Sequence, residues 1–174
     1  MQKNGIFDRL RAIIDHVKGK DRIGKLDLGV LQTMMMLAAM DGDISEKEIS
    51  AFKEMASGCR GYDAASFQTL FESTLRSAGY LLVLTRFLDH DALVAAFVKE
   101  AEKPFVVPVA REATEDRTCA VGCLVRLAEA DGDFSTIEHD CIAALAQRVE
   151  DTHTLFVAAR NAAVSDCAPF YPEV

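Results

Sequence analysis

The sequence predicts an all-α protein, a single-domain helical bundle of about seven or eight helices with an internal pseudo-twofold repeat. Three observations predict it. Apolar residues recur at steps of three and four along most of the chain. Glycine and proline gather between these stretches. An acidic octapeptide occurs twice. Since the chain has 174 residues and half of them are hydrophobic, it can bury one ordered core.

Residues 1–24 are expected to form a basic amphipathic N-terminal helix. Its apolar stripe consists of Ile6, Phe7, Leu10, Ile13, Ile14 and Val17. Residues 1–25 carry seven Lys or Arg against three Asp, although the whole chain has a net charge of −8. Two roles remain open for the stripe: docking on the protein core, or lying on an anionic membrane surface.

The predicted helical domain spans residues 25–165 and begins with a helix over 26–41. Its sequence MMMLAAM is apolar on every side, which is typical of a helix at the centre of a bundle, with methionine filling the core. Further helices are expected over 46–57, 64–78 and 91–102. Gly79 either ends the helix before it or lets the chain bend into residues 80–87.

The first half ends at a segment with the sequence KPFVVP, residues 103–108. Because proline disfavours helical backbone in the residue before it, we expect an extended connector here. The later helices are expected over 116–131, 136–148 and 152–164, before an irregular tail at 166–174. The repeat would then relate residues 26–87 to residues 116–164.

The octapeptides DGDISEKE, at residues 41–48, and DGDFSTIE, at residues 131–138, each have the residues of a tight corner between two helices. A glycine suits the left-handed end of a helix, and a serine followed three residues later by a glutamate forms a capping box. These residues are Gly42, Ser45 and Glu48 in the first copy and Gly132, Ser135 and Glu138 in the second. Ile44 and Ile49 add a hydrophobic staple, which is weaker where Phe134 meets His139.

The same octapeptides bring clustered oxygen donors, the ligands preferred by Ca²⁺ and other hard divalent cations. The candidate metal ligands are Asp41, Asp43, Glu48, Asp131, Asp133 and Glu138. The spacing is not that of an EF-hand, because the glutamate stands at position eight of the loop. Capping and metal binding compete for the glutamate, so both interpretations stay open at this point.

Taken together, these features resemble the bacterial tellurite-resistance TerB family. The resemblance rests on GIFDRLRAII near the start and on the apolar helix followed by Asp-Gly and a capped acidic helix, which occurs twice between about residues 6 and 149. It implies an all-helical protein of a stress-response system, cytoplasmic or peripheral at the inner membrane. It also implies protein partners and a divalent cation, such as Ca²⁺, at the two acidic loops. The tail after Val149 and the five cysteines depart from the family pattern.

Net charge, hydropathy and cysteine content limit the classes of partner and the cellular compartment that we expect. The net charge of −8 argues against nucleic acid. No apolar segment follows Met1 as in a signal peptide, and no apolar run approaches the roughly 20 residues of a membrane-spanning helix. Five cysteines without paired spacing indicate free thiols in a reducing compartment.

No catalytic constellation is apparent. The four histidines, His16, His90, His139 and His153, form no metal or triad motif, although His139 is a candidate accessory ligand beside the second loop. Cys119 and Cys123 share a helix face and are expected to be buried. We therefore predict a protein that is not an enzyme, for which no small-molecule substrate is inferred. The alternative to cation binding is a metal-free adaptor that recruits partners through its acidic surface or at the membrane.

Overall fold

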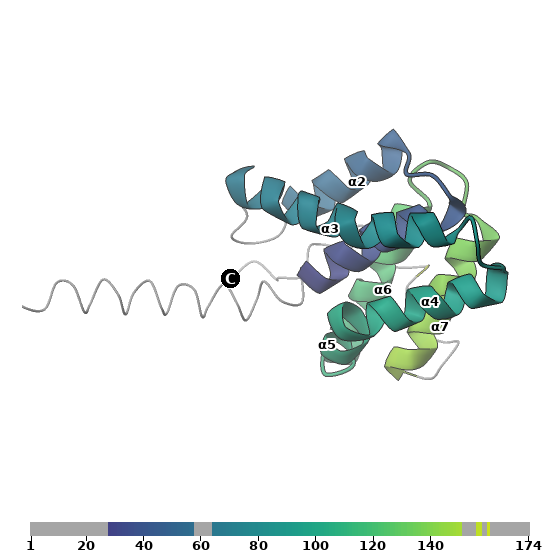
Figure 1. The fold of residues 1–174 in the computed structure, drawn as a ribbon. Coiled ribbons are helices and arrows are strands. Elements are labelled where there is room, and N and C mark those ends of the chain that lie inside the picture. The colour runs from purple at the N-terminus through teal and green to yellow at the C-terminus, as the bar shows by residue number, and fades with distance from the viewer. Residues whose placement is uncertain (1–27, 58–63, 151–155, 158–159, 161–174) are drawn as a thin grey trace, which may run out of the picture.

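A computed structural model describes residues 28–57, 64–150, 156–157 and 160, and all regular secondary structure in these residues is helical. The all-α prediction is confirmed. A helix over residues 28–38 continues into a 3₁₀ turn, η1 (Ala39–Asp41). The elements after it are α2 (Glu46–Ser57), α3 (Ala64–Leu84), α4 (His90–Ala101), the π-helix η2 (Glu102–Val106), α5 (Val107–Val109), α6 (Thr114–Ala128) and α7 (Thr136–Glu150) (Figure 1).

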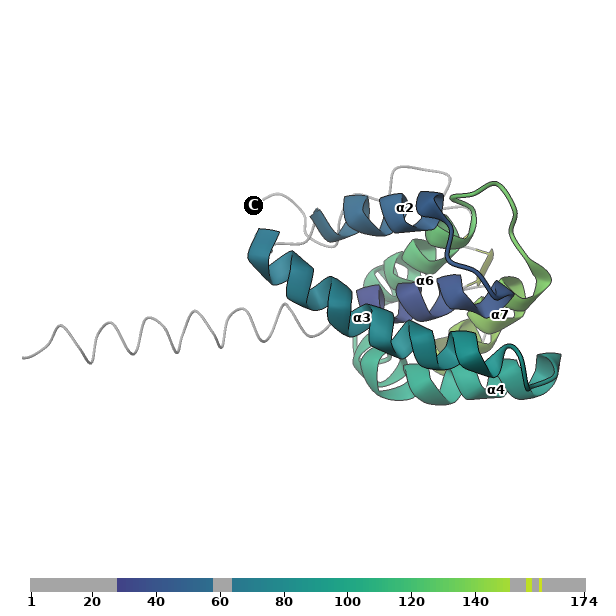
Figure 2. The ribbon, with the colours of Figure 1, turned by 45° about the horizontal axis from the view of Figure 1, so that its top comes forward.

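The helix over residues 28–38 lies in the middle of the molecule, with α3 on one side and α6 and α7 on the other (Figures 1 and 2). Its side chains from Met34 to Ala38, and those of Ala39 and Met40 beyond it, are almost fully buried. The methionines therefore fill the core, as their position in a helix without a polar face predicts. The one buried hydroxyl on this helix, that of Thr33, donates a hydrogen bond to the carbonyl oxygen of Gly29 at 2.8 Å.

The segment 103–108 is not an extended connector, and that prediction was wrong. After α4 the chain forms the π-helix η2 and passes directly into α5. Phe105 and Val106 are buried, so the segment gains apolar burial by coiling against the core. Pro104 lacks an N–H and so disturbs the α-helical ladder, and a π-turn is one of the ways in which a helix absorbs such a disturbance.

Helix α3 runs through Gly79 without a break, which resolves the alternative left open by the sequence. Its last turn is continued by hydrogen bonds from the Thr85 N–H to the Leu81 carbonyl and from the Leu88 N–H to the Leu84 carbonyl. The helix therefore keeps one orientation along its whole length, with Leu81 facing the core.

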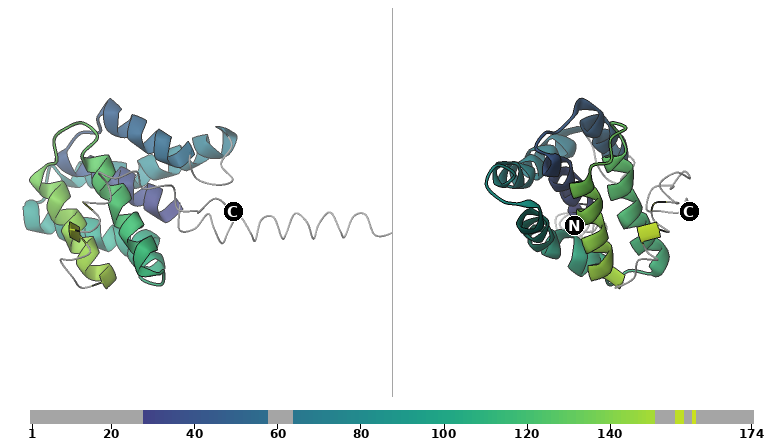
Figure 3. Two further views of the ribbon diagram at one scale, coloured as in Figure 1. Left: turned by 180° about the vertical axis from the view of Figure 1, so that it is seen from behind. Right: turned by 90° about the vertical axis from the view of Figure 1, so that its right-hand side faces the viewer.

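Helices α6 and α7 lie side by side, and α4 packs across α7 (Figure 3). In the predicted helix over 152–164 only residues 156, 157 and 160 are described, and all three are helical. The N-terminal helix over 1–24 and the tail over 166–174 lie outside the described residues. The pseudo-twofold relation between the halves stays a prediction. Among the described helices, none combines the length and the hydropathy needed to cross a membrane.

Candidate functional site

The first acidic corner has the backbone that its sequence predicts. Gly42 has a φ of 96° and donates its N–H to the carbonyl oxygen of Ala39 at 3.2 Å. Since a left-handed φ strains any residue with a Cβ atom, glycine is the favoured residue at this point. The Asp41 side chain turns the chain further, because its Oδ1 accepts a hydrogen bond from the Asp43 N–H at 3.0 Å.

The capping box of this corner is formed in both directions. Glu48 Oε2 accepts a hydrogen bond from the Ser45 N–H at 2.7 Å, and Ser45 Oγ accepts one from the Glu48 N–H at 3.2 Å. Together the two bonds satisfy two backbone donors at the start of α2. The glutamate of this local motif therefore has a structural role, whatever else its carboxylate binds.

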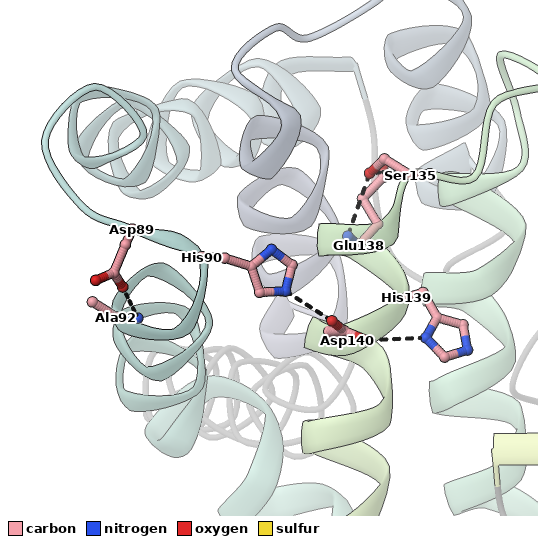
Figure 4. A network of polar contacts seen from close by, with 7 residues as sticks. All are labelled: Asp89, His90, Ala92, Ser135, Glu138, His139 and Asp140. Carbon is pink, nitrogen blue, oxygen red and sulfur yellow. Dashed lines mark hydrogen bonds and ion pairs between the residues drawn. The ribbon is translucent and has the colours of Figure 1, made fainter.

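The second corner repeats this geometry. Gly132 has a φ of 89°, and Asp131 Oδ1 accepts the Asp133 N–H at 2.8 Å. Glu138 Oε2 accepts both the Ser135 N–H at 3.0 Å and the Ser135 hydroxyl at 2.7 Å. Ser135 Oγ in turn accepts the Glu138 N–H at 3.3 Å (Figure 4). Both predicted capping boxes and both predicted left-handed glycines are confirmed.

Aromatic packing takes the place of the aliphatic staple in the second corner. The rings of Phe134 and His139 lie 5.8 Å apart between centroids, and His139 meets the buried Phe156 edge-on at 4.9 Å. His139 is therefore held between two phenylalanines, and its Nδ1 contacts Asp140 Oδ1 at 3.2 Å. Among the described residues, its side chain contacts none of the acidic-loop carboxylates Asp131, Asp133 and Glu138, so the role of accessory ligand gains no support.

The two corners meet in space, which sequence spacing did not indicate. The Lys47 ammonium lies 3.4 Å from the Asp131 carbonyl oxygen. The loop from η1 to α2 and the loop from α6 to α7 approach each other at the same end of the molecule (Figures 1 and 2). Four carboxylates therefore gather from the two loops: Asp41, Glu48, Asp131 and Glu138. We call them the corner carboxylates.

Burial and repulsion from neighbouring carboxylates both disfavour the ionised forms of Asp41, Glu48 and Glu138. Burial raises the pKa of Glu138 to about 7, against the capping bonds from Ser135, and the negative charges of Asp41 and Glu48 add to the rise. The pKa of Glu48 is raised by burial and then by the charges of Asp41 and Asp131. The pKa of Asp41 is raised by burial, and the charge of Asp131 adds to that rise. The corner carboxylates thus interact electrostatically across the two loops.

The carboxylates of the two corners do not form a metal site in this arrangement. In the part of the chain that the structure describes, no three His, Cys, Asp or Glu side chains converge closely enough to hold a metal ion. Glu48 and Glu138 are 3% and 2% exposed, and each uses only Oε2 in its capping box. Asp43 and Asp133 lie at the exposed rim, where Asp43 Oδ1 accepts the Ile44 N–H at 2.9 Å.

A second polar cluster was missed by sequence analysis. Asp140 lies between two imidazoles, with its Oδ2 2.8 Å from His90 Nε2 and its Oδ1 3.2 Å from His139 Nδ1 (Figure 4). These contacts lower the pKa of Asp140. The His90 contact joins the start of α4 to α7 across 50 positions of sequence, so no local pattern predicts it.

The cysteines are distributed differently from the prediction. Cys119 and Cys123 are half-buried rather than buried, while Cys141 is fully buried in α7. Burial raises the pKa of the Cys141 thiol, which keeps it protonated and unreactive. Cys59 and Cys167 lie outside the described residues.

A family model described as tellurite resistance protein TerB matches residues 27–161, a range that includes both acidic corners. No curated protein and no solved structure matches the chain.

Proposed function

The chain belongs to the TerB family, and on this premise we propose that it acts in tellurite resistance by binding a divalent cation, Ca²⁺ first, between its two acidic corners. One observation carries the proposal. The two acidic loops, 90 residues apart in the sequence, lie close together: the Lys47 ammonium is 3.4 Å from the Asp131 carbonyl oxygen, and the charge of Asp131 helps to raise the pKa of Glu48. Negative charge collected in this way favours a cation, because a divalent ion relieves the repulsion.

The residues that would hold the ion are the corner carboxylates, with Asp43 and Asp133 at the rim. Capping does not exclude this role. Among the described residues, Oε1 of Glu48 and Oε1 of Glu138 accept no hydrogen bond, so each capping glutamate keeps one oxygen to offer. Because no three donors converge in the structure, Asp41 and Asp131 would have to turn towards the glutamates. The ion would supply charge neutralisation and cross-linking of the loops, and we propose no chemical reaction for the protein.

Calcium suits this site better than magnesium. Calcium accepts six to eight oxygen ligands in a flexible arrangement, whereas magnesium demands near-octahedral geometry and gives up water reluctantly. Loops that also cap two helices have limited freedom to satisfy a strict octahedron.

Thermal unfolding of the full chain tests this function. An ion that binds only the folded form stabilises it by about 2.7 kcal/mol at a hundredfold excess over its dissociation constant. We expect millimolar Ca²⁺ to raise the Tm, Mg²⁺ to raise it less, and a chelator to reverse both effects. Asp43→Asn and Asp133→Asn should reduce the rise while leaving the capping boxes in place. Asp91→Asn, on the exposed first turn of α4, is the matched control and should leave the rise unchanged.

A metal-free adaptor is the second candidate function. It is favoured by an exposed apolar face on α3 that includes Tyr80, Val83 and Phe87, since a surface of this kind marks a site of interaction. In this case the protein would join the protein partners of a stress-response complex, in the cytoplasm or at the inner membrane. Melting curves that overlay with calcium, magnesium and chelator would leave the corners as helix caps only and favour the adaptor.

A further inference from the structure

Helix α6 carries two thiols on one side. Cys119 and Cys123 stand four residues apart, so their side chains leave the same face of the helix, one turn apart. Asp116 and Arg126 belong to the same face, and all four residues are half-buried at steps of three and four. All other residues from 120 to 125 are buried. The two thiols therefore lie along the line where α6 leaves the core and meets the surface.

The helix holds the two sulfurs too far apart to join directly. Both side chains are thiols in the structure. Cβ atoms at this spacing on a helix are about 5–6 Å apart, whereas a disulfide needs them at about 3.5–4.5 Å. A direct bond between Cys119 and Cys123 would therefore strain α6. A single atom placed between the sulfurs adds one more bond to the bridge and spans the longer distance.

The atom that bridges the sulfurs has to be large and thiophilic. Cysteine sulfur is a soft donor and selects soft partners. The oxyacids of heavy p-block elements fit this description, because their hydroxyl groups exchange for thiols with loss of water. Two thiols fixed on one helix face bind such a centre better than two separate thiols, because the second bond forms within one complex.

We propose that Cys119 and Cys123 chelate one tellurium atom of tellurite, the oxyanion that the name of the matched family specifies. In this step one tellurous acid, TeO(OH)₂, and two cysteine thiols, RSH, give TeO(SR)₂ and two water molecules. Two Te–S bonds form and two Te–OH bonds break, and each hydroxyl leaves with the proton of one thiol. Tellurium keeps its oxidation state, so the step needs no oxidant and no reductant.

Arg126 gives one end of this pair a positive charge, which attracts an anion to a chain with a net charge of −8. It stands three residues after Cys123, on the same face of α6. Its guanidinium lies 3.6 Å from a carboxylate oxygen of Glu54, whose side chain is 73% exposed. Such an exposed ion pair holds the guanidinium weakly, so the side chain can turn towards an arriving anion. Asp116 repels the anion at the other end, so we expect it to approach beside Arg126.

Other contacts of the two cysteines are compatible with this role. Both residues take part in further interactions in the fold. A thiol is only a weak hydrogen-bond donor and acceptor, whereas the bonds to tellurium are covalent. The pair shares no residue with the acidic corners, so the tellurium site and the cation site are independent of each other.

Tellurium retention by the full chain tests the proposal, in chelator so that the cation site plays no part. After tellurite is added and the excess is removed by gel filtration, the parent should retain one tellurium per chain and protect two cysteines from alkylation. The variant with both Cys119→Ser and Cys123→Ser should retain none. The matched control combines Cys59→Ser with Cys167→Ser, which removes the same number of thiols elsewhere in the sequence, and it should behave as the parent.

A displaced thiol tests the spacing. The variant with Thr118→Cys and Cys119→Ser keeps five cysteines but moves one thiol by about 100° around the helix. Because only one sulfur can then reach the tellurium from this face, the tellurite concentration for half occupancy should rise at least about tenfold. The half-buried Thr118 lies next to Cys119, so the change stays at the same level of α6.

Four results would overturn the proposal. A parent that retains no tellurium would exclude the site, whatever calcium does to the Tm. Retention that is unchanged without Cys119 and Cys123 would place the reaction at other thiols. Loss of two thiols without retained tellurium, with a mass lower by two hydrogens, would mean that tellurite oxidises the pair to a disulfide. Retention of arsenite but not of tellurite would assign the pair to a different oxyacid.

Discussion

The Glu138 side chain both stabilises the fold, by capping a helix, and destabilises it, because its negative charge is buried. Its carboxylate caps α7 by accepting two hydrogen bonds from Ser135, yet it is buried near the negative charges of Asp41 and Glu48. The capping bonds lower its pKa, and burial and repulsion raise it by more, to about 7. Between about pH 4.5 and pH 7, Glu138 therefore keeps its proton in the folded state and has lost it in the unfolded chain.

This difference predicts how stability depends on pH in the presence of a chelator. Between the ordinary value of 4.5 and about 7, the folded state binds more protons than the unfolded state, so the free energy of unfolding falls as the pH rises through this window. The loss from Glu138 should be on the order of 2 kcal/mol and should level off above pH 7. Thermal melts at intervals from pH 5 to pH 8 measure it.

Glu138→Gln should remove a large part of this slope, because the amide oxygen can still accept the capping bond and carries no charge. Glu48 and Asp41 have raised pKa values too, so a smaller slope of the same sign should remain. Glu46→Gln, on the exposed first turn of α2, is the control. An unchanged slope in Glu138→Gln would mean that Glu138 is ionised in the folded protein throughout this range.

At the scale of elements, the helix over 28–38 and η2 pack closer than side chains allow. A Cβ atom placed on Gly29 would lie 1.8 Å from the Pro104 carbonyl oxygen and 2.8 Å from its carbonyl carbon. Both atoms belong to the backbone, so neither can swing aside as a flexible side chain does. The two elements therefore touch through main chain at this point, and only glycine fits there.

Gly29→Ala should destabilise the protein by about 2–4 kcal/mol, because the central helix or η2 must move away from its place in the core. Gly79→Ala is the matched comparison, since it lies inside a helix with open space around it, and it should stabilise by about 0.5–1 kcal/mol. Denaturant unfolding of both variants measures the two effects. If the two substitutions change stability alike, helix propensity rather than close packing determines the result at Gly29.

Some of the elements could be predicted from the local sequence and others could not. The corners were predictable because glycine, serine and glutamate act within a few residues of one another, and both capping boxes are formed. The π-helix η2 was not, because Pro104 favours an extended chain locally and only burial of Phe105 and Val106 reverses that preference. The contact of His90 with Asp140 likewise depends on α4 lying across α7.

At the scale of the whole molecule, the candidate site depends on packing that no local pattern contains. The sequence predicted two loops with three carboxylates each. The fold brings Asp41, Glu48, Asp131 and Glu138 into one electrostatic group and leaves Asp43 and Asp133 at its rim. Charge repulsion therefore acts between the halves of the chain, and a cation bound here would join the two halves.

A double-mutant cycle on Asp41 and Asp131 separates one shared cluster from two independent caps. In chelator, Asp41→Asn and Asp131→Asn should each stabilise the protein by about 0.3–1 kcal/mol, because each removes a like charge from the cluster. Asparagine keeps the side-chain oxygen that turns each loop. Since the first substitution already relieves the repulsion between the pair, the double variant should gain less than the sum of the two.

Calcium should reverse the order of stability of the parent and these variants. With the ion present the parent should be the most stable protein and the double variant the least, because each lost carboxylate then weakens binding that favours the folded state. Denaturant unfolding in chelator and in millimolar Ca²⁺ gives all eight free energies of the two cycles. Additive effects in chelator would mean that the two corners do not sense each other's charge, and an unchanged order in calcium would mean that no ion binds between them.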